Sequence, residues 1–316
     1  MRVLITGGAG FVGTNLTYYL QNKHCEVSIL DDFSTGLRSN VPSSVECYEG
    51  SITDFRLVDN LIQKVDAVVH LAARGSVPRS LKNPVLTQNV NTFGTLNVLE
   101  AARNYGTHVV FSSSSSVYGA NLQLPKKENQ VLRPLTPYAA SKMSGEALMM
   151  AYGNSYNLPT TTLRFFNVFG PWQRPDHVYS AVIPRWIWSG ITNKKIQVYG
   201  DGNQSRDFTY VDTVVKTIYT TLSRKIVSPE PVNLALGNNI QLKYLLEMLL
   251  AYFPNLDVEF LEPRPGDVYA SQNDPEVFLE IFPDIRAESF EKSFSETVHW
   301  LRKEHSKVTG GPNVVD

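Results

Sequence analysis

Two side chains four residues apart, Tyr138 and Lys142, are well suited to move a proton. In a helix predicted over residues 138–152 they share one face, because residues four apart are neighbours there. A nearby ammonium favours the phenolate, so we expect Lys142 to lower the pKa of Tyr138 towards neutrality. Tyr138 would then serve as a general acid or base. Taken alone, this spacing is more typical of a surface tyrosine beside a solvated lysine. A run of serines, 112–116, at a predicted strand end favours the catalytic interpretation.

The first thirteen residues predict the element that positions this chemistry. Residues 2–6 form a short apolar strand pattern, a glycine-rich turn follows, and residues 14–21 form a helical pattern. In such a turn Gly7 permits the tight bend, Gly10 lets the backbone approach a pyrophosphate, and Gly13 lets helix and strand pack closely. The free N–H groups at the helix N-terminus would then face the phosphates. A glycine-rich turn without a ligand is the alternative for an isolated motif.

The acids that follow the second strand favour NAD as the bound dinucleotide. The strand predicted over residues 26–30 ends at Asp31, which follows Gly13 by 18 residues. This is close to the roughly 20-residue spacing of an acid that binds the adenosine ribose hydroxyls. Asp32 adds a second carboxylate, which would repel a 2′-phosphate. We therefore expect NAD rather than NADP.

Strand and helix patterns alternate through the first half of the chain, which predicts a Rossmann-type α/β fold with a doubly wound parallel sheet. We expect an NAD-binding domain at residues 1–166, with a return segment near residues 207–236. Residues 167–316, richer in loop prolines and aromatics, would form a smaller α+β domain that binds the substrate. The polar tail from residue 305 to 316 is expected to be a mobile end.

Composition limits the class of protein further. The chain has 316 residues, a net charge of −1, 42% hydrophobic residues and 19% charged residues, all ordinary for a globular protein. The sequence contains no block of like charges of the kind that would indicate binding to nucleic acid or to a membrane surface. Cys25 and Cys47 have neither metal-ligand spacing nor a disulfide framework, so we expect no metal and a cytoplasmic location. Any anionic substrate must be met by a few placed arginines.

Eight motifs in order resemble one known family, and together they extend over residues 1 to about 274. The chain is similar to the extended short-chain dehydrogenase/reductases, and among them to nucleotide-sugar epimerases of the UDP-glucose/UDP-N-acetylglucosamine 4-epimerase type. The motifs are Thr6–Gly13, His70–Ala73, Ser114–Gly119, Tyr138 with Lys142, Phe166–Pro171, Ala181–Arg185, Arg206–Asp212 and Arg264–Asp267.

The resemblance implies a role for each matching residue. Ser114, Tyr138 and Lys142 would be catalytic, with Ser114 sharing the proton of the sugar 4-hydroxyl. The residues implied for NAD are Gly7, Gly10, Phe11, Val12, Gly13, Asp31, Asp32, Ser34, Thr35, Gly36, Ser51, Ile52, Leu71, Ala72, Ala73, Asn91, Ser112, Tyr138, Lys142 and Phe165. Those implied for a UDP-sugar are Ser76, Ser114, Ser115, Ser116, Tyr138, Asn167, Val182, Ile183, Arg185, Arg206, Arg264, Asp267 and Ser271.

The resemblance also implies a homodimer and a choice of sugar. Helices over residues 84–103 and 138–152 would pair with their copies, through apolar residues that include Leu96, Val98, Leu99, Leu148 and Met149. Ser271, four residues after Asp267, would leave room beside the sugar C2 for an N-acetyl group. The alternatives are that these apolar residues all face the sheet, and that Ser271 is a loop serine without a role.

Two departures from the family pattern affect the activity. Ser51 stands where an acid often contacts the adenine. Ser114-Ser115-Ser116 stands where related 4,6-dehydratases have Thr-Asp-Glu, so the acid/base pair for eliminating water is missing there. The sequence thus favours C4 epimerisation of a UDP-sugar through a 4-keto intermediate. The alternatives are a dehydratase or reductase on the same scaffold and, from another class, a non-catalytic NAD sensor.

Overall fold

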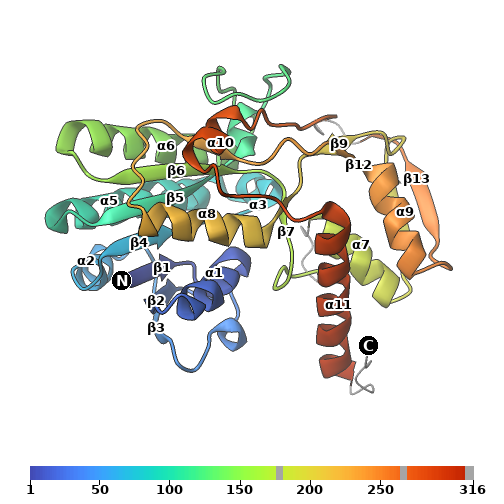
Figure 1. The fold of residues 1–316 in the computed structure, drawn as a ribbon, viewed down its shortest axis with the longest axis horizontal. Helices are drawn as coiled ribbons and strands as arrows, with labels where there is room; N and C mark the ends of the chain where they lie inside the picture. The colour runs from blue at the N-terminus through green and yellow to red at the C-terminus, as the bar shows by residue number, and fades with distance from the viewer. Residues whose placement is uncertain (176–180, 264–268, 310–316) are drawn as a thin grey trace.

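A seven-stranded, all-parallel sheet forms the centre of the computed structural model, which describes residues 1–175, 181–263 and 269–309 (Figure 1). Its strand order is β11-β6-β5-β4-β1-β2-β3. The bounds are β1 Arg2–Thr6, β2 Glu26–Asp31, β3 Glu46–Glu49, β4 Ala67–His70, β5 His108–Ser114, β6 Thr160–Phe165 and β11 Val232–Leu234. The order reverses beside β1, which is the crevice where doubly wound sheets bind ligands. The predicted Rossmann-type fold is confirmed.

Helices cover both faces of this sheet because its strands are apolar on both sides. On one face α1 (Phe11–Asn22), α8 (Val211–Ser223) and α10 (Glu276–Ile281) share a buried cluster with β1, centred on residues such as Ile5, Leu16 and Val214. On the other face α2 (Phe55–Ile62), α5 (Gly94–Tyr105) and α6 (Pro137–Tyr156) pack through residues such as Val68 and Val98. The side chain of Asp54 caps α2 at the N–H of Leu57.

The long helix predicted over residues 84–103 is not one regular α-helix. It consists of α4 (Pro84–Gln88), a π-helical turn η2 (Asn89–Phe93) and α5, and it is preceded by α3 (Val77–Lys82). The prediction failed at the π-helical turn, because the hydrophobic pattern does not reveal an extra residue in one turn. Such turns often occur at functional sites, and this one carries Asn91.

The second half of the chain builds a smaller unit around its own buried cluster, to the right in Figure 1. Its helices are α7 (Val182–Ile191), α9 (Leu242–Tyr252) and α11 (Phe290–Thr309), and β8 (Ile196–Tyr199) pairs with β13 (Val258–Leu261). The remaining short elements are η1 Arg38–Asn40, η3 Ser115–Tyr118, β7 Val168–Phe169, β9 Ser205–Arg206, β10 Thr209–Tyr210 and β12 Ile240–Gln241. This is an α+β arrangement.

Residues beyond 207 do return to the first sheet. Helix α8 contacts α1, and β11 extends the sheet beside β6. The domain division at residue 166 stays a prediction.

The predicted mobile tail is wrong for residues 305–309, which belong to α11; residues 310–316 lie outside the described part. In the described ranges, no helix combines the length and apolarity needed to cross a bilayer.

The apolar residues expected at a dimer contact face the protein interior instead. Val98, Leu99 and Met149 are fully buried in the cluster beneath α5 and α6, and Leu96 and Leu148 pack against it. The reason is the period of the helix: these positions lie on the stripe that faces the sheet. The exposed apolar side chains of this region are others, among them Leu81, Val85, Phe93 and Met143.

Candidate active site

The glycine turn between β1 and α1 has the shape needed to hold a pyrophosphate. Gly7 has a φ of +74°, and a Cβ there would lie 2.7 Å from the backbone nitrogen of Ala72. A Cβ on Gly13 would lie 2.6 Å from the Cα of Gly8, so only glycine lets the helix sit this close. At Gly10 a Cβ would meet only the Gly7 carbonyl oxygen within 4 Å. The turn therefore leaves open space beside its backbone N–H groups, which fits a dinucleotide.

Asp31 ties the end of β2 to this turn. Its Oδ2 accepts a hydrogen bond from the N–H of Ala9 at 2.9 Å, and its Oδ1 accepts one from Phe33 at 2.9 Å. Burial raises the pKa of the carboxyl group, although both bonds act in the opposite direction. Asp32 is exposed and accepts from the N–H and hydroxyl of Ser34. Both acids therefore border the crevice, as the ribose-binding interpretation requires.

The other residues predicted for the cofactor lie along the carboxyl edge of the sheet. Thr35 and Gly36 follow β2, Ser51 and Ile52 follow β3, and the segment from Leu71 to Ala73 follows β4. Ser112 lies near the end of β5, Phe165 ends β6, and Phe11 and Val12 form the first turn of α1. Because the strands are parallel, their ends meet at one edge, and the sheet brings this set together.

Tyr138, Ser114 and Lys142 meet at the ends of α6 and β5. The hydroxyl of Tyr138 is hydrogen-bonded to the Ser114 side chain. The Ser114 Oγ also accepts from the N–H of Ser116 at 3.2 Å and from its hydroxyl at 2.9 Å. The Nζ of Lys142, a buried residue, donates to the carbonyl oxygen of Ser112 at 2.7 Å. The hydroxyls form a connected path along which a proton can move.

The expected electrostatics of this pair are wrong in one respect. Burial raises the pKa of Tyr138, and the hydrogen bond from Ser114, rather than the charge of Lys142, acts against that rise. Burial instead lowers the pKa of Lys142 to about 8, opposed by the nearby carboxylate of Glu146. The physical reason is that the lysine is itself desolvated and directs its ammonium to Ser112. In this structure burial therefore favours the protonated form of Tyr138, and its use as a base requires a nearby positive charge.

Asn91 and Ser76 occupy special backbone positions beside the site. Asn91 is buried in the π-helical turn; its Oδ1 accepts from the N–H of Arg74 at 2.6 Å, and its Nδ2 donates to Ser141 at 2.9 Å. It therefore orders the loop after β4 against α6. Ser76 has a φ of +97°, and its buried Oγ has no hydrogen-bond partner in the described structure. Such strain is typical of ligand sites.

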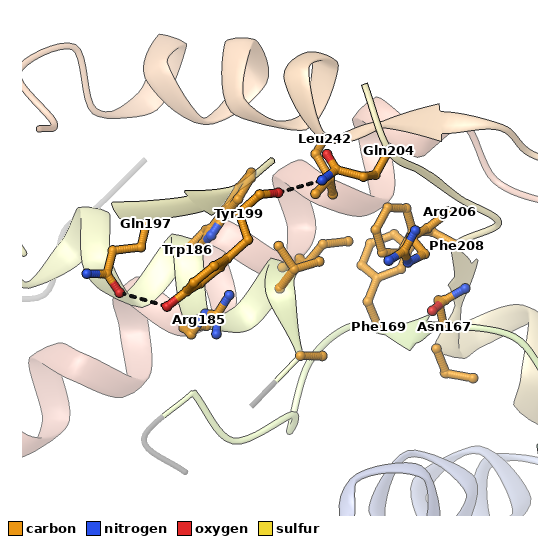
Figure 2. A pocket seen from close by; sticks show the side chains of 14 residues that line it. Asn167, Phe169, Arg185, Trp186, Gln197, Tyr199, Gln204, Arg206, Phe208 and Leu242 are labelled. Atoms are coloured by element: carbon orange, nitrogen blue, oxygen red, sulfur yellow. Dashed lines mark hydrogen bonds between the residues drawn. The ribbon is translucent and has the colours of Figure 1, made fainter. Parts of the chain in front are cut away.

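A cavity of about 250 Å³ opens between β7, α7 and β8 (Figure 2). Five residues predicted to bind substrate line it: Asn167, Val182, Ile183, Arg185 and Arg206. The Arg206 guanidinium donates to the carbonyl oxygen of Ser205 at 2.8 Å. Asn167 has a φ of +35° and donates to the carbonyl oxygen of Asp207 at 3.1 Å. The cavity thus combines two guanidinium groups with apolar walls, a lining suited to a nucleotide.

Comparison with known proteins identifies the family. Residues 3–235 match the NAD dependent epimerase/dehydratase family. The chain belongs to this family. A solved UDP-N-acetylglucosamine 4-epimerase of Methanobrevibacter ruminantium M1, in complex with UDP-N-acetylmuramic acid, is 33% identical with a TM-score of 0.90, over 96% of this chain and 98% of that chain. A UDP-glucose 4-epimerase of Thermotoga maritima, solved with UDP-glucose, is 30% identical with a TM-score of 0.91, over 96% and 100%. A dTDP-glucose 4,6-dehydratase of Mycobacterium tuberculosis is 31% identical, over 97% of this chain and 95% of its own.

The cofactor of this NAD-dependent epimerase/dehydratase is NAD. The glycine turn and the carboxylates of Asp31 and Asp32 are the residues that fit it. In the described ranges no group of three or more His, Cys, Asp or Glu side chains could hold a metal ion.

Some predicted substrate residues are not among the described residues that line the cavity. Arg264 and Asp267 lie outside the described residues. The N–H of Ser271 donates to the carbonyl oxygen of Ser205 at 3.1 Å. Ser205 directly precedes Arg206, which lines the cavity. Ser115 and Ser116 form the first turn of η3, directly after Ser114.

Several cavity residues were missed by sequence reasoning, among them Trp186, Gln197, Tyr199, Gln204 and Phe208. Two of them carry buried polar atoms without a hydrogen-bond partner in the described structure, the Nε1 of Trp186 and the Oε1 of Gln204. Alternation along β8 was the available signal, because Gln197 and Tyr199 share the face opposite to the buried Ile196 and Val198.

Proposed function

We propose that this chain epimerises a UDP-sugar at C4 through a 4-keto intermediate. The observation that carries the proposal is the placement of Ser114, Tyr138 and Lys142 at the carboxyl edge of the sheet that also carries the glycine turn, with Ser114 bonded to Tyr138 and Lys142 bonded to Ser112. A binding module would have no use for a tyrosine hydroxyl linked to a serine, with a buried lysine on the same face of the helix. Family membership supports the general reaction class.

Each residue of the set has a distinct task in the proposed reaction. When bound, NAD would supply the acceptor and then the donor for the C4 hydrogen and its electron pair. Tyr138 takes the proton of the 4-hydroxyl and gives it back, with Ser114 sharing that proton through their hydrogen bond. Lys142 would hold the nicotinamide ribose. Release of the sugar ring from one orientation and its return in another would expose both faces of C4.

We assign residues 1–166, with the return segment near 207–236, to NAD, and the remainder mainly to the nucleotide sugar. The 250 Å³ cavity would hold the nucleotide, with Arg206 and Arg185 facing its phosphates. Ser76 and Asn167 would bind sugar or phosphate oxygens. Arg264 and Asp267 complete the proposed substrate set.

The proposed sugar is UDP-N-acetylglucosamine, with UDP-glucose as a second substrate. Ser271 supports this choice, because a small side chain beside the sugar C2 leaves space for an N-acetyl group. A nucleotide-sugar dehydratase or reductase is the alternative, and a dehydratase is present among the relatives. The three serines 114–116 disfavour dehydration, since they provide no carboxyl group for elimination. A non-catalytic NAD sensor would not need Tyr138 and is the least favoured function.

A homodimer is also part of the proposal. Leu81, Val85, Phe93 and Met143 are exposed apolar side chains on α3, α4, η2 and α6, and these elements pack together. We call these four residues the helix surface. Exposed apolar surface of this kind is typical of a contact between protein chains, and a second copy of the chain is its proposed occupant.

The proposed location is the cytoplasm, where free thiols persist. Cys25 and Cys47 are both free in the structure.

One assay separates the candidate reactions. The purified chain with NAD is incubated with UDP-glucose, UDP-N-acetylglucosamine or UDP-glucuronate, and products are identified by NMR. A C4 epimer of the supplied sugar supports the proposal. A stable 4-keto-6-deoxy product identifies a dehydratase, and no product from any of these substrates contradicts the proposed activity.

A further inference from the structure

A buried ion pair lies directly behind the catalytic residues. The Arg164 guanidinium donates to both oxygens of Glu146, with Nε to Oε1 at 2.9 Å and Nη2 to Oε2 at 2.8 Å. Both side chains are about 3% exposed. The same guanidinium donates through Nη1 to the Tyr118 hydroxyl at 2.9 Å and to the Glu128 carbonyl oxygen at 3.2 Å. The pair therefore has full hydrogen-bond partners and cannot rearrange freely.

Glu146 belongs to the same helical stripe as the catalytic pair. Tyr138, Lys142 and Glu146 follow one another at intervals of four residues on α6, so their side chains lie on one face. The three side chains on this helical face form hydrogen bonds with three successive residues of β5. The Ser112 carbonyl accepts from Lys142, and Ser114 bonds Tyr138.

Between them, the Ser113 hydroxyl donates to Glu146 Oε1. Ser113 is paired in register with Arg164 on β6. Glu146 and Arg164 thus join α6, β5 and β6 at the level of the reacting groups.

Stability alone is a weak reason for such a pair. Replacing a buried ion pair by apolar side chains of similar size is often neutral or stabilising, because desolvation offsets the attraction between the charges. The charge of Glu146 has a specific target instead. Lys142 is desolvated, and Glu146 supports its ammonium form. His70 on β4, which is buried and neutral, also faces Lys142, and Tyr138 is the other titratable side chain on this face of α6.

We propose that Glu146, held by Arg164, is a positioning residue that keeps the Lys142 ammonium charged and aligns β5 with α6. This role rests on the proposed epimerase function. Glu146 touches neither substrate nor cofactor in this scheme; it acts through Lys142 and through Ser113. Its contribution is to maintain the charge of Lys142 at a pH where burial would otherwise favour the neutral amine.

The test is a direct titration of Lys142 in the full chain. The ¹³Cε signal of isotopically labelled lysine, assigned with Lys142→Arg, reports its pKa without any need for turnover. In Glu146→Gln the shape is retained and the charge is lost, so we expect the pKa of Lys142 to fall below its value near 8. The alkaline limb of kcat for the UDP-sugar should move to lower pH by the same amount, with little change in KM.

Two further variants complete the experiment. Glu100→Gln is the matched control, because Glu100 pairs with Arg103 on α5 at a partly exposed site and should leave the titration unchanged. If Glu146→Gln does not fold, the double variant Glu146→Leu, Arg164→Met removes both charges and is titrated in its place. An unchanged Lys142 pKa in a folded variant overturns the proposal. Absence of epimerase activity in the unaltered protein would refute the proposed function while leaving the lysine titration valid.

Discussion

The Nζ of Lys142 lies 2.7 Å from the carbonyl oxygen of Ser112, two residues before Ser114 on the same strand. The lysine is therefore anchored to the strand that presents the serine hydroxyl to Tyr138. Its ammonium is not free to follow the tyrosine, and burial lowers its pKa to about 8. The proton chemistry of the site depends on this anchoring as much as on the spacing of four residues on α6.

Tyr138→Phe should remove nearly all turnover while NAD binding and folding stay intact. The variant loses only the hydroxyl, which is the group that exchanges a proton with the sugar, and a lost acid/base group costs about a hundredfold or more in rate. NMR assay of the epimer and calorimetric titration with NAD check the two halves of this prediction. Near-normal turnover would show that another group moves the proton.

The rate should fall as pH rises through about 8, if the Lys142 ammonium is required. The sign follows from the direction of the shift: a lysine whose pKa is lowered keeps its charge below that pKa and loses it above. Lys142→Ala should lower the rate and move the pH optimum upward, because the alkaline limb set by the titration of Lys142 is then absent. The pH profiles of kcat for both proteins provide the measurement, and superimposable profiles would contradict the assignment.

Asp31→Ala should weaken NAD binding and lower stability. The substitution leaves the N–H groups of Ala9 and Phe33 without their acceptor, which costs about 1–3 kcal/mol for each buried group. Asp31→Asn is the matched control, because its amide oxygen can still accept one of the two bonds.

Calorimetric titration should also give a strong preference for NAD over NADP in the unaltered protein. Equal affinity for the two cofactors would reject the role of the two carboxylates.

Ser271→Tyr should abolish turnover of UDP-N-acetylglucosamine and spare UDP-glucose if that sugar is used. A tyrosine ring would fill the space proposed for the N-acetyl group. Ser271 is joined to β9 through its N–H, so the backbone is expected to stay in place. Product analysis with each sugar checks the outcome. Unchanged activity on the acetylated sugar would remove Ser271 from the site.

Phe93→Glu should turn a dimer into monomers. Phe93 is 59% exposed on the helix surface, and a carboxylate there would be buried without a partner on association. Light scattering at micromolar concentration measures the change, and Leu122→Glu, at an exposed position on the loop after η3, serves as the control. A monomeric unaltered protein would refute the dimer.

The sequence by itself determined the fold class and the first outline of the site. Strand β1 has the bounds predicted for it, because its apolar pattern is strong and ends at a turn. The glycine turn could be predicted equally well, because each of its three glycines meets a local steric requirement. Parallel strands then placed Ser114, Asp31 and Leu71 at one edge without any further information.

Only the tertiary structure decided which groups are desolvated and which distant side chains meet. The spacing of Tyr138 and Lys142 predicted a cation acting on a phenol, but burial of both groups reversed the expected pKa shift of the tyrosine. The pairing of Glu146 with Arg164 and the walls of the cavity come from residues far apart in the chain. Helical period placed Val98 and Met149 on apolar stripes, and the packing of the sheet turned those stripes inward. A sequence pattern specifies which faces are apolar, whereas burial and long-range contacts depend on how the whole chain packs.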